Sequence, residues 1–140
     1  MENNCIFCKI INNEIPCFKI AEDEDFLAII DISQIVEGHT IVIPKKHFET
    51  FTDVDDVDDY FEFATKVARH FKKDLGYKFV DIFVLGRGVP HAHIHLIPHN
   101  DDNPEWKEAL SKIGSMQDDQ SRRKSSEEYK RISDKFAMSN

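Results

Sequence analysis

The stretch VPHAHIHLIPHN, residues 89–100, places four of the chain's seven histidines within nine positions. Three of them, His91, His93 and His95, stand at every second position and alternate with apolar residues. Successive side chains of a β-strand point to opposite faces, so the pattern predicts a strand with three imidazoles on one face. Three adjacent titratable rings repel one another when protonated, and when buried each needs hydrogen-bond partners for its nitrogens. Packing alone therefore explains the pattern poorly.

Two kinds of chemistry use such a row of imidazoles. The rings could ligate a catalytic zinc ion, because histidine is a common zinc ligand. Alternatively, one neutral ring attacks phosphorus as a nucleophile while its neighbours donate hydrogen bonds to the phosphate oxygens, where negative charge develops. The spacing of the histidines is compatible with both uses.

The composition limits the possible partners. With 140 residues, 41% apolar residues and eleven Phe, the chain is expected to fold as one domain around a hydrophobic core. Its net charge of −8 disfavours a nucleic acid polymer as partner. No apolar run approaches the roughly 20 residues of a membrane span, and residues 1–10 do not resemble a secretory signal. We therefore expect a cytoplasmic protein without a membrane partner.

Short apolar runs predict five strands. FKIAEDEDFLAIID, residues 18–31, indicates a hairpin around an acidic turn. TIVIP, residues 40–44, indicates a third strand that ends at its proline. VDIFVLG, residues 80–86, and HAHIHLIP, residues 91–98, are expected to pair through a tight turn that contains the sequence GRG.

The longest predicted helix begins at Val57, where apolar residues recur at the spacing of one helical face. Aspartates precede it, lysines lie near its end, and Gly76 stands where a C-terminal cap belongs. Together the elements predict an α+β fold with a five-stranded antiparallel sheet, one long helix and peripheral helices. We expect residues 1–100 to form the core and residues 101–140 a C-terminal helical extension of the same domain.

Three stretches of the chain, in the right order, resemble the histidine-triad (HIT) superfamily, in particular its bacterial-type nucleotide hydrolases. They are CIFCKIINNEIP at residues 5–16, IIDISQIVEGHTIVIPKKH at residues 29–47 and VPHAHIHLIP at residues 89–98. The resemblance implies a HIT-like fold and an enzyme that acts through a covalent nucleotidyl-histidine. It also implies a homodimer in which the long helix and an edge strand continue the sheet across two subunits.

The resemblance assigns a role to each histidine of the motif. His93, the middle one, matches the nucleophile, and His95 matches the residue that binds the α-phosphate oxygens. His91 would orient the site through its hydrogen bonds, and His39 would join the cluster near the phosphate. Asp31 matches the aspartate that grips the ribose hydroxyls, which a carboxylate can do by accepting two hydrogen bonds.

Apolar residues at four positions match those that sandwich the base in relatives. Three of them, Ile6, Phe7 and Ile10, fall in CIFCKIINNEI, residues 5–15, whose apolar spacing predicts a short amphipathic helix, and the fourth is Ile32. Helical spacing alone would also be satisfied if the first three were ordinary core residues.

The segment before the triad, VLGRGVPHAHIH at residues 84–95, departs from the family pattern. It has no Asn, and Arg87 stands where relatives often carry Gln. A guanidinium offers phosphate a fixed positive charge and a bidentate fork, which an amide does not. We therefore expect Arg87 to bind the substrate and to favour polyphosphate substrates, the alternative being a solvated turn residue. His99 is expected at the surface and is given no role.

A Cys-x-x-Cys pair begins the first predicted helix, and a chain with three cysteines is unlike a disulfide framework. In bacterial-type relatives these cysteines form a structural zinc site with two histidines, which match Cys5, Cys8, His47 and His91 here. Two thiolates and two imidazoles make a closed set that braces the fold without activating water. The alternative is a pair of reduced thiols. No organic cofactor is expected.

The predicted function is that of a nucleotide hydrolase or transferase, of the purine nucleoside phosphoramidase or dinucleoside polyphosphate hydrolase type. Its substrate would be a small AMP or GMP conjugate, and it would release the nucleoside monophosphate by breaking a phosphoramide or phosphoanhydride bond. Two alternatives stay open. One is a zinc hydrolase that uses all three strand histidines as ligands, and the other is a non-catalytic nucleotide-binding or partner-binding protein.

Overall fold

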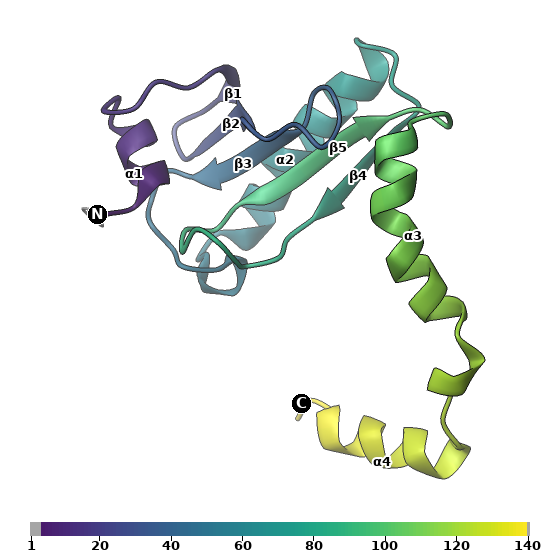
Figure 1. Ribbon diagram of the computed structural model, residues 1–140. Coiled ribbons are helices and arrows are strands. Elements are labelled where there is room, and N and C mark those ends of the chain that lie inside the picture. Colours follow the sequence, from purple (N-terminus) through teal and green to yellow (C-terminus); the bar gives the residue numbers. More distant parts are fainter. Residues whose placement is uncertain (1–3, 140) are drawn as a thin grey trace. The chain divides into compact units, whose positions relative to one another are not determined.

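The computed structural model describes residues 4–139, and the chain forms two compact units that divide between Trp106 and Lys107. Its elements, shown in Figure 1, are α1 (Ile6–Ile11), β1 (Lys19–Glu22), β2 (Phe26–Ile30), β3 (Thr40–Pro44), η1 (Phe51–Asp53), α2 (Val57–Lys73), β4 (Phe79–Phe83), β5 (Ile94–His99), α3 (Pro104–Asp118), η2 (Gln120–Arg122) and α4 (Ser126–Phe136). The predicted α+β fold is confirmed. The predicted division into a core and an extension of one domain stays a prediction.

The five strands form one antiparallel sheet in the order β1-β2-β3-β5-β4, so that β1 and β4 are its edges. Its two faces follow the alternation of the strand residues. Ala28, Val42 and Ile94 pack against α2, which lies along one face of the sheet (Figure 1). Ile29 and Ile41 point to the other face, where they pack with α1. The candidate site lies on this second face.

Helix α2 has the bounds and the cap that the sequence predicts. It begins at Val57 with aspartates in its first turn, and it buries a side that includes Tyr60 and Phe71. At its end Gly76 takes a φ of +80°. The N–H of Tyr77 then donates to the Phe71 carbonyl over 3.2 Å, which satisfies a carbonyl of the last turn of the helix.

Two local predictions around the triad are wrong. Strand β4 ends at Phe83 and β5 begins at Ile94, so residues 84–93 form a long connection instead of a tight GRG turn. The N–H of Ala92 donates to the Phe48 carbonyl over 2.7 Å, so this part of the connection bonds to the segment after β3 and does not pair with β4. Of the three triad histidines, only His95 lies within the strand.

The turn that leads into β3 depends on a glycine. Gly38 has a φ of +92°, and a Cβ there would lie 2.9 Å from the Cγ of Pro98. We expect Gly38→Ala to destabilise the protein by more than the roughly 1–3 kcal/mol of a strained left-handed residue, because the clash adds to the strain. Chemical denaturation measures the loss.

Gly76→Ala is the matched control for that substitution. Gly76 also has a positive φ, but a Cβ there would meet no atom of the described residues within 4 Å. This variant should therefore show the backbone strain alone. Equal losses of stability for the two variants would contradict a role for the contact between residue 38 and Pro98.

The second unit contains most of α3 together with η2 and α4. Helix α4 has an N-terminal cap, since the Ser125 hydroxyl accepts from the N–H of Glu128 over 3.2 Å. The helix buries no residue, and Tyr129 and Phe136 stay exposed on it. Within residues 4–139, none of the helices combines the length and the apolar character that a membrane crossing requires.

Candidate functional site

A pocket of about 330 Å³ opens on the face of the sheet opposite α2. All the predicted substrate-binding residues line it, and so do two histidines of the triad: Ile6, Phe7, Ile10, Asp31, Ile32, Arg87, His93 and His95. The rest of the lining is mostly aliphatic: Ile15, Pro16, Ile29, Ile30, Ile41, Gly88 and Val89. The pocket therefore combines a large apolar wall with a few polar groups, as sites for small organic ligands do.

His93 is held with one ring nitrogen committed to the backbone. Its Nδ1 lies 2.7 Å from the carbonyl oxygen of His91. Because a carbonyl can only accept, Nδ1 carries the proton, and in the neutral ring Nε2 keeps its lone pair. The ring of Phe7 meets that of His93 edge to face at 5.3 Å and limits its rotation. In its neutral form the His93 ring could therefore act as a base or a nucleophile through Nε2 at the wall of the pocket.

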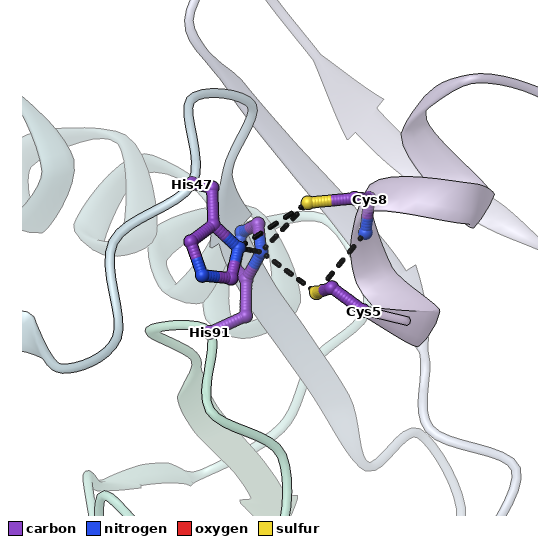
Figure 2. A group of neighbouring side chains, drawn as sticks. All are labelled: Cys5, Cys8, His47 and His91. Carbon is purple, nitrogen blue, oxygen red and sulfur yellow. Dashed lines mark hydrogen bonds between the residues drawn. The ribbon is translucent and has the colours of Figure 1, made fainter. Parts of the chain in front are cut away.

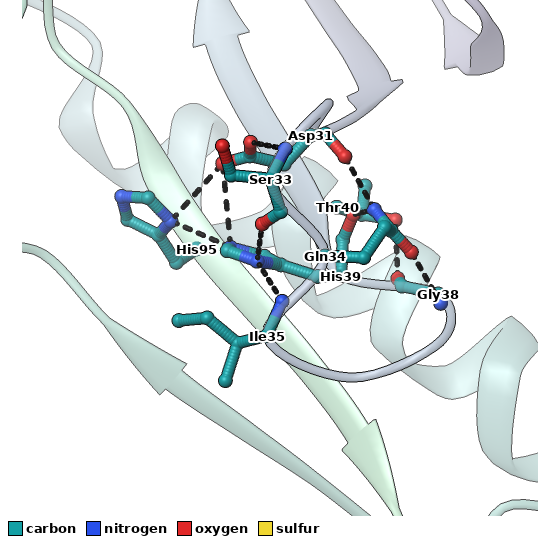
Figure 3. Close-up of polar contacts among 8 residues, drawn as sticks. All are labelled: Asp31, Ser33, Gln34, Ile35, Gly38, His39, Thr40 and His95. Atoms are coloured by element: carbon teal, nitrogen blue, oxygen red, sulfur yellow. Dashed lines mark hydrogen bonds and ion pairs between the residues drawn. The ribbon is translucent and has the colours of Figure 1, made fainter. Parts of the chain in front are cut away.

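His39 and His95 form a hydrogen-bonded pair beside Asp31 (Figure 3). His39 Nδ1 lies 3.0 Å from the Ser33 carbonyl oxygen and 3.3 Å from the N–H of Ile35. The shorter contact favours a proton on Nδ1, because a carbonyl can only accept; Nε2 of His39 then accepts from His95 Nδ1–H over 2.8 Å. The second carboxylate oxygen of Asp31 lies 3.5 Å from His39 Nε2 and 3.9 Å from His95 Nδ1. A phosphate at this point would meet two imidazoles whose positions are already fixed.

The loop from residue 31 to residue 39 is held by its own side chains. The amide of Gln34 donates to the carbonyls of Asp31 and His39 and accepts from the N–H of Gly38. The N–H of Ser33 donates to Asp31 over 2.8 Å. These bonds orient the carboxylate before any ligand binds, which lowers the entropic cost of binding.

Burial favours the neutral forms of His95 and His39. It lowers the pKa of His95 to about 4, with a smaller contribution from positive charge on His93 and His39. It also lowers the pKa of His39, although the carboxylate of Asp31 opposes the shift. At neutral pH both rings are therefore uncharged unless an anion binds beside them.

These shifts predict a pH dependence of stability. The folded-state pKa values lie below the unfolded value of about 6.5, so the unfolded chain binds more protons between pH 6.5 and pH 4. Stability should therefore fall as the pH drops through that window, and His95 alone should contribute on the order of 1–3 kcal/mol. Thermal unfolding of wild type and of His95→Gln from pH 7 to pH 4.5 measures it. Parallel curves for the two proteins would contradict the assignment.

A second cluster, shown in Figure 2, includes the first histidine of the triad. Its four residues, Cys5, Cys8, His47 and His91, bring four ligand atoms together. His91 Nδ1 lies 3.3 Å from the Cys5 sulfur, 3.5 Å from the Cys8 sulfur and 3.2 Å from His47 Nδ1. Tetrahedral zinc with ordinary bond lengths holds its ligand atoms roughly 3.3–3.8 Å apart, so the spacing fits that ion.

The environment of this cluster also suits a metal. The Nε2–H of His91 donates to the Pro44 carbonyl over 2.8 Å, which turns the lone pair of Nδ1 toward the sulfurs. Burial lowers the pKa of His91 to about 4, so the ring is neutral. Helix α1 supplies both thiols within one turn, where the Cys5 sulfur accepts from the N–H of Cys8.

Two features of the site were missed from the sequence. Phe83 stacks on His95 with 4.2 Å between ring centroids and 13° between planes, and it also stacks on Trp106. His99 is half-buried and donates to Asp81 over 2.8 Å, so its expected place as a plain surface residue is wrong. The carboxylate of Asp81 also accepts from the indole N–H of Trp106 over 2.7 Å. His99 therefore helps to fix the start of α3.

An antiparallel sheet that presents a His-x-His-x-His segment to an apolar pocket has the fold and the site of a histidine-triad protein. Residues 12–102 match the sequence model of the HIT domain, and this chain belongs to the HIT family. It is 41% identical to the protein named Protein hit of Bacillus subtilis over 104 residues, which cover 68% of this chain and 70% of that protein.

Two further relatives carry more informative names. The adenosine 5′-monophosphoramidase HNT1 of Saccharomyces cerevisiae is 38% identical over 124 residues, which cover 80% of this chain and 77% of the yeast protein. A zinc-bound histidine triad family protein from Mycobacterium smegmatis has a crystal structure that superposes with a TM-score of 0.64 at 29% identity. The superposition covers 81% of this chain and 97% of the mycobacterial one.

Proposed function

We propose that this protein hydrolyses small nucleoside monophosphate conjugates through a covalent nucleotidyl-histidine on His93. The observation that carries the proposal is the hydrogen bond from His93 Nδ1–H to the His91 carbonyl, which leaves Nε2 as a free nucleophile in the pocket. The yeast relative, named an adenosine 5′-monophosphoramidase, supports the same class of reaction.

The proposed reaction has two steps. His93 Nε2 attacks the α-phosphorus, a nitrogen–phosphorus bond forms, and the phosphoramide or phosphoanhydride bond breaks as the leaving group takes up a proton. Water then attacks the same phosphorus, the nitrogen–phosphorus bond breaks, and the nucleoside monophosphate leaves with His93 restored. In both steps the reaction depends on positioning and on stabilisation of the phosphate charge.

The neighbouring residues would bind the two ends of the nucleotide. The negative phosphate favours the protonated form of His95, whose Nε2–H can then donate to a phosphate oxygen. His39 Nε2 would keep accepting the hydrogen bond from Nδ1–H of His95. Asp31 would accept hydrogen bonds from the ribose hydroxyls, and the aliphatic wall around Phe7 and Ile10 would hold the base.

The cluster of Cys5, Cys8, His47 and His91 would hold a structural zinc ion, as its donor set and spacing indicate. All four ligand positions would be filled by the protein, so the ion would supply rigidity and no water-derived nucleophile. The ring of His91 is part of this cluster, and the carbonyl of His91 accepts the hydrogen bond from His93 Nδ1–H. The metal would thereby fix the backbone that orients the nucleophile.

We further propose a cytoplasmic homodimer joined through β4, with α2 beside it. Strand β4 is a sheet edge, and Phe79 and Ile82 on it are exposed apolar residues. Edges of this kind are available for pairing with another strand. Light scattering at several protein concentrations measures the oligomeric state.

A turnover assay tests the proposed function. Purified protein is incubated with adenosine 5′-phosphoramidate, AMP release is followed by chromatography, and binding of AMP is measured in parallel by calorimetry. We expect multiple turnovers. AMP binding with no release across phosphoramidates and dinucleoside polyphosphates would overturn the proposal in favour of a non-catalytic nucleotide-binding protein.

Arg87 gives a prediction about substrate preference. It lies at the pocket between two glycines of positive φ, Gly86 and Gly88, and no acidic partner for it is present among residues 4–139. We expect Arg87→Gln to lower kcat/KM for a dinucleoside polyphosphate by about 10–100-fold, because a hydrogen bond to a charged leaving group is lost. A phosphoramidate with an amine leaving group should change far less.

The exposed Arg69 on α2 provides the matched control, since Arg69→Gln removes the same charge away from the pocket. Equal effects of Arg87→Gln on both substrates would contradict a role in leaving-group recognition.

A further inference from the structure

Asp31, His39 and His95 have a second property besides their place in the phosphate site. One ligand atom from each lies close to the other two: the second carboxylate oxygen of Asp31, Nε2 of His39 and Nδ1 of His95. The three separations are 2.8, 3.5 and 3.9 Å (Figure 3). Two imidazoles and one carboxylate are a ligand set that divalent transition metals use in proteins.

The spacing suits such an ion with small adjustments. Ligand atoms at ordinary bond lengths of about 2.1 Å lie roughly 3.0 Å apart around an octahedral ion and 3.4 Å apart around a tetrahedral one. The two nitrogens would separate slightly, and the carboxylate would move toward them. The proton between the nitrogens would shift to Nε2 of His95, so no net proton release is required.

Outer contacts already hold the ligands in place, as they do around metal ligands in general. His39 is 2% exposed and donates from Nδ1 to the Ser33 carbonyl. The N–H of the same serine donates to the other oxygen of Asp31. The ring of Phe83 stacks on His95 and fixes its plane.

This set differs from the cysteine cluster in being open. It supplies three ligands, and both Asp31 and His95 line the pocket, so the remaining coordination positions would face the space where substrate enters. It contains no thiolate, which separates it from the cluster of Cys5, Cys8, His47 and His91 both in chemistry and in spectroscopic signature.

We propose that Asp31, His39 and His95 form a second, reversible site for a divalent transition-metal ion, and that its occupation inhibits the protein. Inhibition rests on the proposed function, because the ion would occupy the carboxylate that binds ribose and the imidazoles that hold the phosphate. Binding itself requires no turnover and can be tested separately.

The test begins with full-length protein that carries one equivalent of zinc, verified by metal analysis, and titrates it with Co²⁺ alone. We expect a second equivalent to bind with d–d absorption and without the thiolate-to-cobalt charge-transfer band. Co²⁺ should also broaden the ring resonances of His39 and His95 in NMR spectra and spare those of the exposed His70. Asp31→Asn, which keeps the shape of the side chain, should weaken this binding by more than about 10-fold.

Asp81→Asn is the matched control, because Asp81 is also a carboxylate bonded to a histidine, His99, but lies outside the ligand set. It should leave Co²⁺ binding unchanged. Binding of one equivalent only, or a second equivalent that Asp31→Asn does not weaken, would overturn the site. A second equivalent of Zn²⁺ that binds without slowing AMP release would overturn the inhibition. Absence of AMP release from protein that carries only the first equivalent of zinc would count against the proposed function instead.

Discussion

Replacing His93 with alanine is expected to lower kcat/KM for adenosine 5′-phosphoramidate by about 10⁴-fold or more, because no other group takes over from a lost nucleophile. Binding of AMP should weaken only a few-fold. The pocket keeps its aliphatic wall and Asp31, and His93 contributes one face of one ring. A stopped assay for AMP release and a calorimetric titration with AMP measure the two quantities.

Substitution of His93 by glycine, which has no side chain, makes the test of its role more specific. His93→Gly leaves a space in which free imidazole can act in place of the missing ring, so added imidazole should restore part of the turnover. His70→Ala is the control, because His70 is an exposed histidine on α2 and should not affect activity. Full turnover by His93→Ala would contradict the assigned role.

Loss of the proposed zinc site is expected to have the largest effect on stability. Cys8→Ser should lower the free energy of unfolding by about 4 kcal/mol or more, the range expected when a structural metal is lost. The effect should include loss of activity, because His91 connects the cluster to the backbone that orients His93. Metal analysis and chemical denaturation of wild type and variant give the comparison.

The third cysteine supplies the control for this substitution. Cys17 is half-buried and packs beside the same apolar residues, but it is not part of the four-residue cluster. Cys17→Ser should therefore retain zinc and most of its stability. A chelator should lower the melting temperature of wild type and of Cys17→Ser but not that of Cys8→Ser. Equal sensitivity of all three proteins to the chelator would contradict a structural metal.

The alternation of residues around His95 predicted more than any other pattern in the chain. Because the period of a strand is two, it separated Ile94 and Leu96, which pack toward α2, from His95, which faces the pocket. Ile29 and Ile41 also line the pocket, but their strands are almost continuously apolar and buried, so no alternation in the sequence distinguishes them from core residues. The resemblance then supplied the two residues that lie far away in sequence, Asp31 and His39.

Long-range contacts set the limit of prediction. The turn between β4 and β5 was predicted as tight because two glycines flank Arg87, whereas the segment instead bonds to Phe48 and enters the metal cluster at His91. No local signal in the sequence reports those partners. The stack of Phe83 on His95 was missed for the same reason, since it follows from strand register.

His91 joins the two clusters of the molecule. Its ring is completely buried between the thiols and Pro44, while its carbonyl oxygen accepts from His93. A single residue therefore connects the α1 region to the hydrogen bond that orients the ring of His93. The losses of activity caused by a substitution in the cluster and by one at His93 should for this reason not add up in the double variant.

The most direct measurement is the mass of the intact protein, quenched in denaturant within milliseconds after mixing with adenosine 5′-phosphoramidate. Wild type is expected to gain the mass of one adenylyl group, which disappears as AMP is released, and peptide mapping should place the group on His93. His93→Ala should gain nothing. AMP release by wild type without any covalent adduct, or an adduct that persists in His93→Ala, would contradict a nucleotidyl-histidine mechanism at this residue.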